Sequence, residues 1–408
     1  MKSRILPYGS LLLSLLLAGG ALRWNPFLHA SNGLASIFAA GPDWAQISLL
    51  YKDPKTQEVT NGENPAPGLE ELTHWWGAAE PGAKRIFLMG NSQTYTVLLA
   101  PGEFPLTVPE KTYPDLLADF YRQKNGNPIH LYRLSAPNIS YMEMLWYLTY
   151  MTQSPELKPS AVLLQVNYEE FRKTGIRSGL LTLLPDPKFY AAIRKLAENE
   201  KPYSGIFKEA LSEYDRQLAA AHRGGNPAAG AMGASTHTGI AQSNGWGNLL
   251  ETKLRATLEQ SATFRERHNL KTGLLNFLYL CRVYFLHIKP TTPRSLGPAQ
   301  LAAASSSLDE IAQLCAQNQI KLAIFNAPQN PLTPLYKTAA DRATYERTIR
   351  ELALRRQLRF YDFESAVPGP YWGVWIDGPD PIHIGRAAHQ ILAEKIEQSR
   401  ILEEITEP

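Results

Sequence analysis

Arg85–Met89 (RIFLM) runs directly into Gly90–Thr94 (GNSQT), so that a short apolar run is followed at once by a small polar turn. Apolar runs that are too brief for a helix are typical of buried strands. A serine placed where a buried strand turns into a helix is exposed at the carboxyl edge of the sheet, where open α/β sheets build their sites. Ser92 is therefore the first candidate for chemistry in this chain.

Four further apolar runs share this short length and are rich in Ile, Val, Leu, Phe or Tyr. They are Ile129–Leu134, Ala161–Val166, Lys321–Phe325 and Arg359–Phe363. Helical patterns separate most of them, for example Tyr113–Gln123 and Met142–Met151. Strands that alternate with helices form a parallel sheet, because each crossover helix buries its apolar stripe on a face of that sheet. We expect a three-layer α/β/α sandwich with a five-stranded parallel sheet.

The interval from about 172 to 319 breaks this alternation and is expected to be a large helical insertion. The sandwich domain would then comprise residues 81–171 and 320–408. The expected helices of the insertion are Phe189–Asn199, Gly205–Ala221, Leu249–Arg267 and Leu274–His287. Residues 223–248 are dominated by Gly, Ala, Ser and Asn, which bury too little apolar surface to order a segment. We expect a flexible loop there.

The amino terminus has the order of an export signal. Lys2 and Arg4 precede the apolar stretch Ile5–Leu22. Small residues at 18–21 suit a cleavage site, and the stretch is also nearly long enough to span a bilayer with its basic end inside. We interpret residues 1–24 as a signal anchor or a signal peptide, and residues 25–80 as an extracytoplasmic tether with one helix near Gly68–Trp76. A buried helix of a cytoplasmic protein fits Pro7 and the missing polar face poorly.

Charge and cysteine content narrow the function classes. The formal net charge is +3 over 408 residues, and the basic residues are scattered, so we expect no nucleic-acid partner. Cys281 and Cys315 lie in helix-like apolar stretches without a second Cys or His at metal-ligand spacing. Buried free thiols are the simpler interpretation, and one disulfide is the alternative in an oxidising compartment. We expect no metal or other cofactor.

A second candidate element lies near the other end of the chain, in Asp380-Pro381-Ile382-His383. An Asp three residues before a His can orient that imidazole from one short loop, leaving the other ring nitrogen to take a serine proton. Asp377 is a rival orienting acid, and we favour Asp380. A lone serine at such a turn is often only a helix N-cap. Together, however, Ser92, His383 and Asp380 indicate a catalytic triad.

These residues resemble a known family. Gly90–Thr94 resembles the Gly-Asp-Ser block of the SGNH or GDSL-like hydrolase superfamily, and Asp380–His383 resembles its terminal Asp-x-x-His block. The resemblance implies a flavodoxin-like sandwich in which Ser92 is the nucleophile, His383 the general base and Asp380 the residue that orients His383.

Two further blocks of that family concern the oxyanion hole. Gln165-Val166-Asn167 occupies the place of a Gly-x-Asn block, which implies that Asn167 is a side-chain donor. Ser135-Ala136-Pro137-Asn138 most resembles the block that offers a backbone N–H; because Pro137 has none, Asn138 is the expected donor. Asn91 stands where the family has Asp, and Gln165 and Asn138 stand where it has Gly.

The combination of an anchor and a large insertion resembles extracytoplasmic proteins that acylate envelope polymers, such as DltD-like teichoic-acid D-alanylation proteins and the SGNH-like proteins of alginate O-acetylation. It implies an anchored serine esterase or O-acyltransferase that acts on an exported polysaccharide through an acyl-enzyme. The implied partners are an acylated carbohydrate polymer or acyl donor, the membrane, and a membrane-bound O-acyltransferase. Trp146, Trp372 and Trp375 are the candidate sugar-binding aromatics, although core packing is the commoner role of a tryptophan.

A function of another class is also open. The chain could be a non-catalytic binding or assembly component of a polysaccharide modification or export system that keeps the fold while its site has drifted. The features that favour it are Asn91 and Gln165.

Overall fold

The structure is a computed structural model that describes residues 48–52, 59–62, 83–95, 111–125, 129–135, 138–223, 284–285, 292, 295–333, 337–375 and 378–407. The chain divides into two compact units. One comprises Met1–Asp43 and Thr236–Leu286, of which only the helical pair at 284–285 is described. All elements below belong to the other unit, Trp44–Ser235 and His287–Pro408.

Several predicted segments lie outside the described residues. They are the signal segment, the tether helix near Gly68–Trp76, the loop from residue 224 onward, Leu249–Arg267, and Leu274–His287 apart from the helical pair at 284–285. Within the described part of the chain, no helix combines the length and apolarity needed to cross a bilayer. The anchor at residues 1–24 therefore stays a prediction.

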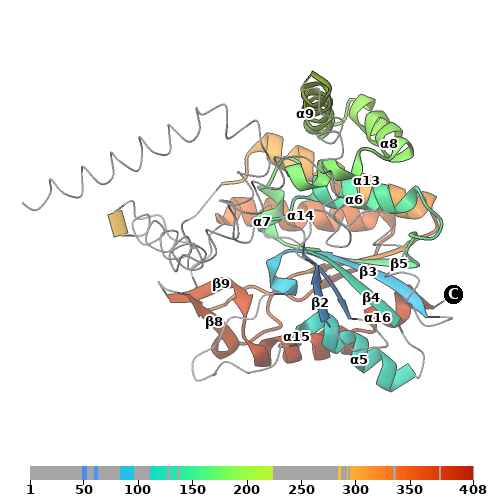
Figure 1. Ribbon diagram of the computed structural model, residues 1–408. Helices are drawn as coiled ribbons and strands as arrows, with labels where there is room; N and C mark the ends of the chain where they lie inside the picture. The colour runs from blue at the N-terminus through green and yellow to red at the C-terminus, as the bar shows by residue number, and fades with distance from the viewer. Residues whose placement is uncertain are drawn as a thin grey trace, which may run out of the picture. The chain divides into compact units, whose positions relative to one another are not determined.

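Seven strands of the described residues form one sheet, in the order β2-β1-β4-β3-β5-β6-β7 (Figure 1). Five of them are mutually parallel: β3 (Lys84–Gly90), β4 (Ile129–Ser135), β5 (Ala161–Val166), β6 (Lys321–Asn326) and β7 (Phe360–Asp362). They coincide closely with the five predicted runs, which confirms the parallel sheet. The chain moves from β3 to β4 and then to β5 on the other side of β3, so the strand order reverses beside β3. Such a switch point is where open sheets bind ligands.

The sheet is wider than predicted. β1 (Ser48–Lys52) pairs antiparallel with β4, and β2 (Val59–Gly62) pairs antiparallel with β1. Both come from residues 25–80, which we expected to be a tether with one helix. Their pairing covers the edge of β4, which would otherwise present unpaired backbone groups.

Helices cover both faces of the sheet. On one face lie α5 (Tyr113–Asn125), α15 (Arg386–Gln398) and α16 (Ile401–Thr406); on the other lie α6 (Tyr141–Thr152), α7 (Tyr168–Phe171), α13 (Pro298–Gln317) and α14 (Ala339–Arg356) (Figure 1). β3 shows how the sequence builds these layers. Ile86 and Leu88 pack on the first side, and Phe87 and Met89 on the second, because successive strand side chains point to opposite faces. The three-layer sandwich is therefore confirmed.

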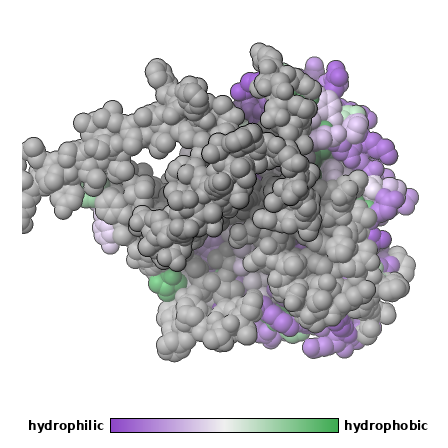
Figure 2. Space-filling model, in the orientation of Figure 1, coloured by the Kyte–Doolittle hydropathy of each residue, from purple (hydrophilic) through white to green (hydrophobic). Residues whose placement is uncertain are grey.

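The interval between β5 and β6 adds helices outside α6. After the 3-10 segment Ser178–Leu183 come α8 (Pro187–Glu198) and α9 (Ser204–Arg223), close to two predicted helices. The described surface around α8 is mostly hydrophilic in Figure 2. α13 was not predicted, because its sequence is dominated by Ala and Ser and gives a weak apolar pattern. It packs against α6 and α7 and thus covers the sheet.

Cys315 lies on α13, where it is buried and free of any disulfide. Burial raises the pKa of its thiol to about 12, since a thiolate would lose its hydration there. The buried-thiol interpretation therefore holds for Cys315. Cys281 lies outside the described residues.

Two of the tryptophans considered as sugar platforms belong to the core. Trp146 on α6 contacts Phe189 and Phe207 edge-on, with ring centroids 5.5 and 5.6 Å apart, and its Nε1 donates to the carbonyl of Leu180 at 3.2 Å. Trp372 is also buried, and its Nε1 donates to a neighbouring backbone carbonyl. A sugar platform at these two residues is therefore wrong, because neither ring faces solvent. The side chain of Trp375 is not described.

Trp146→Ala is expected to lower the free energy of unfolding by about 3–5 kcal/mol, because it removes a fully buried ring from between two aromatic neighbours. Urea unfolding followed by circular dichroism measures this loss. The matched control is Leu354→Ala at an exposed position of α14, where a change within roughly 0.5 kcal/mol is expected. A loss below about 1 kcal/mol for Trp146→Ala would contradict its place in the core.

Candidate active site

Ser92 opens a single 3-10 turn, Ser92–Thr94, directly after β3. The side chain of Asn91 caps this turn, since its Oδ1 accepts the backbone N–H of Gln93 at 2.9 Å. Gly90 leaves the space that the turn needs: a Cβ there would lie 2.4 Å from Gln165 Oε1 and 2.6 Å from Thr94 Cγ2. The half-buried serine is thus held at the end of a buried strand.

The structure brings the three predicted triad residues together. Ser92 Oγ lies 2.8 Å from His383 Nε2, and His383 Nδ1 lies 3.1 Å from Asp380 Oδ2. His383 and Asp380 belong to β9 (Gly378–Ile384), which pairs antiparallel with β8 (Trp372–Trp375). With the Nδ1–H donated to the carboxylate, Nε2 faces the serine as an acceptor. This arrangement can deprotonate the hydroxyl.

Asp380 is fixed by contacts beyond the imidazole. Its Oδ1 accepts the backbone N–H of Ile382 at 2.7 Å and of His383 at 2.6 Å, and its carbonyl accepts from Asn330 Nδ2 at 2.8 Å. Burial disfavours the carboxylate, but the bonds from His383 and the two amides outweigh it and hold the pKa of Asp380 below its ordinary value. Asp380 is therefore ionised at neutral pH. Asp377 lies outside the described residues.

The predicted oxyanion-hole residues follow the two strands beside β3. Asn167 comes directly after β5 and caps α7, its Oδ1 accepting the N–H of Glu169 at 3.1 Å. Asn138 follows β4, is exposed, and has φ 53°. Asn tolerates this left-handed conformation better than most residues, which suits a position where the resembling family has glycine. Because the carboxyl ends of parallel neighbours share one edge, both residues lie on the edge that carries Ser92.

A network of buried amides beneath the triad was not anticipated. Gln93 is fully buried; its Nε2 donates to the carbonyls of Ile382 at 2.6 Å and Pro328 at 3.1 Å. Its Oε1 accepts from Gln165 Nε2 at 2.6 Å, and Gln165 Oε1 accepts the hydroxyl of Tyr113 at 3.0 Å. Gln165, the residue in place of a family glycine, therefore supports the serine turn. The signal in the sequence is a glutamine inside an otherwise apolar strand.

Gln93→Leu is expected to lower kcat for a small ester roughly tenfold with little change in KM, since two hydrogen bonds to the segments around His383 are lost. Steady-state kinetics with a chromogenic acetyl ester measures the effect. Gln390→Leu on α15, whose side chain donates to Glu394 Oε1 at 2.8 Å, is the matched control. Equal kcat values for the parent and Gln93→Leu would rule out this support.

A buried cation also holds the serine turn. Arg133 on β4 donates from Nη1 to the carbonyl of Thr94 at 2.6 Å and to Thr112 Oγ1 at 2.8 Å. Burial lowers the pKa of Arg133 to about 10, so the guanidinium stays charged at neutral pH. The far end of the turn is thereby tied to the neighbouring strand.

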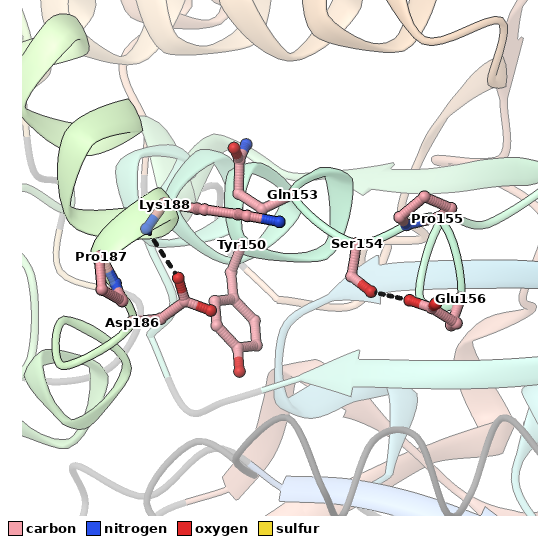
Figure 3. A pocket seen from close by; sticks show the side chains of 8 residues that line it. All are labelled: Tyr150, Gln153, Ser154, Pro155, Glu156, Asp186, Pro187 and Lys188. Atoms are coloured by element: carbon pink, nitrogen blue, oxygen red, sulfur yellow. Dashed lines mark hydrogen bonds between the residues drawn. The ribbon is translucent and has the colours of Figure 1, made fainter.

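A hollow of about 520 Å³ lies away from this site (Figure 3). Its lining comes from the end of α6, the loop that follows, and the start of α8, and includes Tyr150, Glu156 and Lys188. The carbonyl of Glu156 accepts from Arg85 Nη1 near the start of β3, which places the hollow at the amino edge of the sheet. Ser92 lies at the carboxyl edge. We therefore do not assign the hollow to the triad.

No protein-family model and no curated protein sequence matches the chain. Among solved structures, it is similar to an acetylxylan esterase from Geobacillus stearothermophilus, at 12% identity and a TM-score of 0.34 over 81% of this chain and 98% of that one. It is also similar to a carbohydrate acetylesterase from Sinorhizobium meliloti, at 8% identity and a TM-score of 0.33 over 78% of this chain and 97% of that one. Likeness at this level does not assign the chain to a family.

Proposed function

We propose that the protein is a serine esterase or O-acyltransferase that works through Ser92, His383 and Asp380. The observation that carries this proposal is the unbroken chain of hydrogen bonds from Asp380 Oδ2 through the imidazole to Ser92 Oγ. Hydrogen bonding of nucleophile, base and orienting acid in this order is the constellation of serine acyl transfer.

The reaction then has two halves. His383 Nε2 takes the hydroxyl proton while Ser92 Oγ bonds to the ester carbonyl carbon, and the same proton passes to the departing alkoxide as the ester C–O bond breaks. In the second half, His383 deprotonates water or a sugar hydroxyl as its oxygen attacks the acyl carbon, and the proton returns to Ser92 Oγ as the acyl C–Oγ bond breaks. The reaction is a hydrolysis when water is the acceptor and an acyl transfer when a sugar hydroxyl is the acceptor.

The oxyanion of each half-reaction would be stabilised by Asn167 and by the backbone N–H groups of Ser92 and Asn138. These groups come from the ends of β3, β4 and β5, which are neighbours in the sheet. One such donor is typically worth about 3 kcal/mol of barrier.

The proposed substrate is an acyl ester on a cell-envelope or exported polysaccharide. The support is the export-type amino terminus together with the sequence blocks around Ser92 and His383. In this proposal the catalytic unit is extracytoplasmic and anchored through residues 1–24, or secreted if that segment is cleaved. A membrane-bound O-acyltransferase would be the partner that delivers the acyl group.

The non-catalytic alternative drew on Asn91 and Gln165, which depart from the family blocks. Both side chains make buried hydrogen bonds that support the serine turn. The departures therefore have a structural role compatible with catalysis, and we favour the enzyme.

A fluorophosphonate tests the proposal directly, because it phosphonylates a serine only where a base activates the hydroxyl. We expect the full chain to gain one phosphonyl group, located by peptide mass spectrometry on the peptide that contains Ser92. The Ser92→Ala variant should gain none. An unlabelled parent, or equal labelling of both proteins, would refute an activated Ser92.

A further inference from the structure

A buried contact joins the serine turn to the helix that begins at Asn167. Asn91 Nδ2 donates to Glu170 Oε1 at 2.6 Å, and the two residues are 4% and 2% exposed. Asn91 immediately precedes Ser92, and Glu170 lies on α7, whose cap is Asn167. The pair thus bridges the element that carries the candidate nucleophile and the element that carries a candidate oxyanion donor.

Both the oxygen and the nitrogen of the Asn91 side-chain amide are hydrogen-bonded. Its Oδ1 accepts the N–H of Gln93 at 2.9 Å while its Nδ2 donates to Glu170. An aspartate could still cap the turn, but it has no N–H for Glu170 and would set two carboxyl groups against each other. The contact therefore explains why Asn91 stands where the resembling family has Asp.

We propose that Glu170 is a positioning residue, which acts through Asn91 to hold Ser92 in register with Asn167. The role rests on the proposed function, since it concerns the relative placement of the nucleophile and the oxyanion donor. A second contact supports α7 at the same point: the hydroxyl of Tyr141 donates to the carbonyl of Asn167 at 3.3 Å.

The charge state of Glu170 follows from its surroundings. The groups that act on it are Asn91 from the serine turn, Tyr141 from α6, and Glu169 and Lys173 from α7. Burial raises the pKa of Glu170 to about 8, with the hydrogen bond from Asn91 and the charge of Lys173 opposing and that of Glu169 reinforcing the rise. At neutral pH the group is therefore mostly an uncharged acid that accepts from Asn91.

A double-mutant cycle tests the role, with kcat and KM for a small acetyl ester measured from pH 6 to pH 9 on the full chain. In Asn91→Asp the two facing carboxyl groups can form a hydrogen bond only while one of them is protonated. We expect its kcat to fall roughly threefold at pH 6 and roughly thirtyfold at pH 9, with KM nearly unchanged. Glu170→Gln alone should lower kcat about threefold, since the new side-chain N–H₂ has no acceptor among the described residues.

The double variant Asn91→Asp/Glu170→Gln tests whether the contact itself matters. In it the amide introduced at position 170 donates to the carboxylate introduced at position 91, so kcat should return to within about threefold of the parent and lose the extra pH dependence. Asn91→Asp/Glu169→Gln is the matched control, because Glu169 is the neighbouring acid on α7 and pairs with Arg172 instead. That control should keep the full Asn91→Asp defect.

The outcomes separate the two proposals. A parent without Ser92-dependent turnover would refute the proposed function, and the positioning role with it. A parent with such turnover, combined with an Asn91→Asp variant of unchanged kcat at every pH or with no rescue by Glu170→Gln, would overturn the positioning role alone.

Discussion

Ser92→Ala is expected to reduce kcat for a small acetyl ester by about a millionfold, down to the background rate. The reason is that Ser92 Oγ, which lies 2.8 Å from His383 Nε2, is the atom that would bond to the acyl carbon, so no acyl-enzyme can form without it. The fold should survive, because the turn is held by Asn91, Gln93 and Arg133 rather than by the serine hydroxyl.

Ester turnover by the parent and the variant, at matched concentration and with thermal unfolding recorded for both, measures this effect. Ser305→Ala is the matched control, since that hydroxyl only donates back to Leu301 within α13. A Ser92→Ala variant that keeps a tenth or more of the parent rate would remove Ser92 from the chemistry.

Asp380→Asn is expected to lower kcat by about 10⁴-fold while leaving the side-chain shape almost unchanged. Oδ1 accepts two backbone N–H groups, so the new amide nitrogen must occupy the place of Oδ2 and face His383 Nδ1. Nδ1 would then accept a hydrogen bond from the amide, so Nε2 would carry the ring hydrogen and point it at Ser92 Oγ. In that tautomer the imidazole cannot act as a base.

The pH dependence has a defined sign. Because the pKa of Asp380 is held below its ordinary value, the carboxylate persists across the working range of the parent, and its contribution to stability is lost only as the pH falls through that lowered pKa. Steady-state kinetics across pH measures the Asp380→Asn loss. Asp186→Asn is the matched control, because aspartate and asparagine both serve as the N-cap of a helix such as α8. An unchanged kcat in Asp380→Asn would shift the orienting role to Asp377.

The strands were predictable because each parallel strand is a short apolar run bounded by polar turns, as β3 and β5 show. Other elements were not. α13 owes its place to tertiary packing of small residues, and β1 owes its place to pairing with β4, with β2 pairing in turn with β1. A local pattern contains no information on such distant partners.

The site residues also differ in whether a local sequence pattern could identify them. Ser92, Asp380 and His383 could be found because they belong to two short recognisable blocks, Gly90–Thr94 and Asp380–His383. Gln93, Gln165 and Glu170 could not be assigned, since their roles depend on partners such as Ile382 and Asn91 that lie far away in the chain. The sequence alone left open whether Trp146 and Trp372 bind sugar or pack in the core, and their burial in the structure assigns both to the core.

The serine and the histidine that would activate it are 291 positions apart in the chain. A ribosome therefore completes β3, β4, β5 and β6 before the base exists at all, and the hydroxyl remains an ordinary alcohol throughout synthesis. A chain that terminates before the β8–β9 hairpin contains Ser92 but lacks His383. Under the proposed mechanism, the order of the two blocks would leave the nucleophile without its base until synthesis is nearly finished.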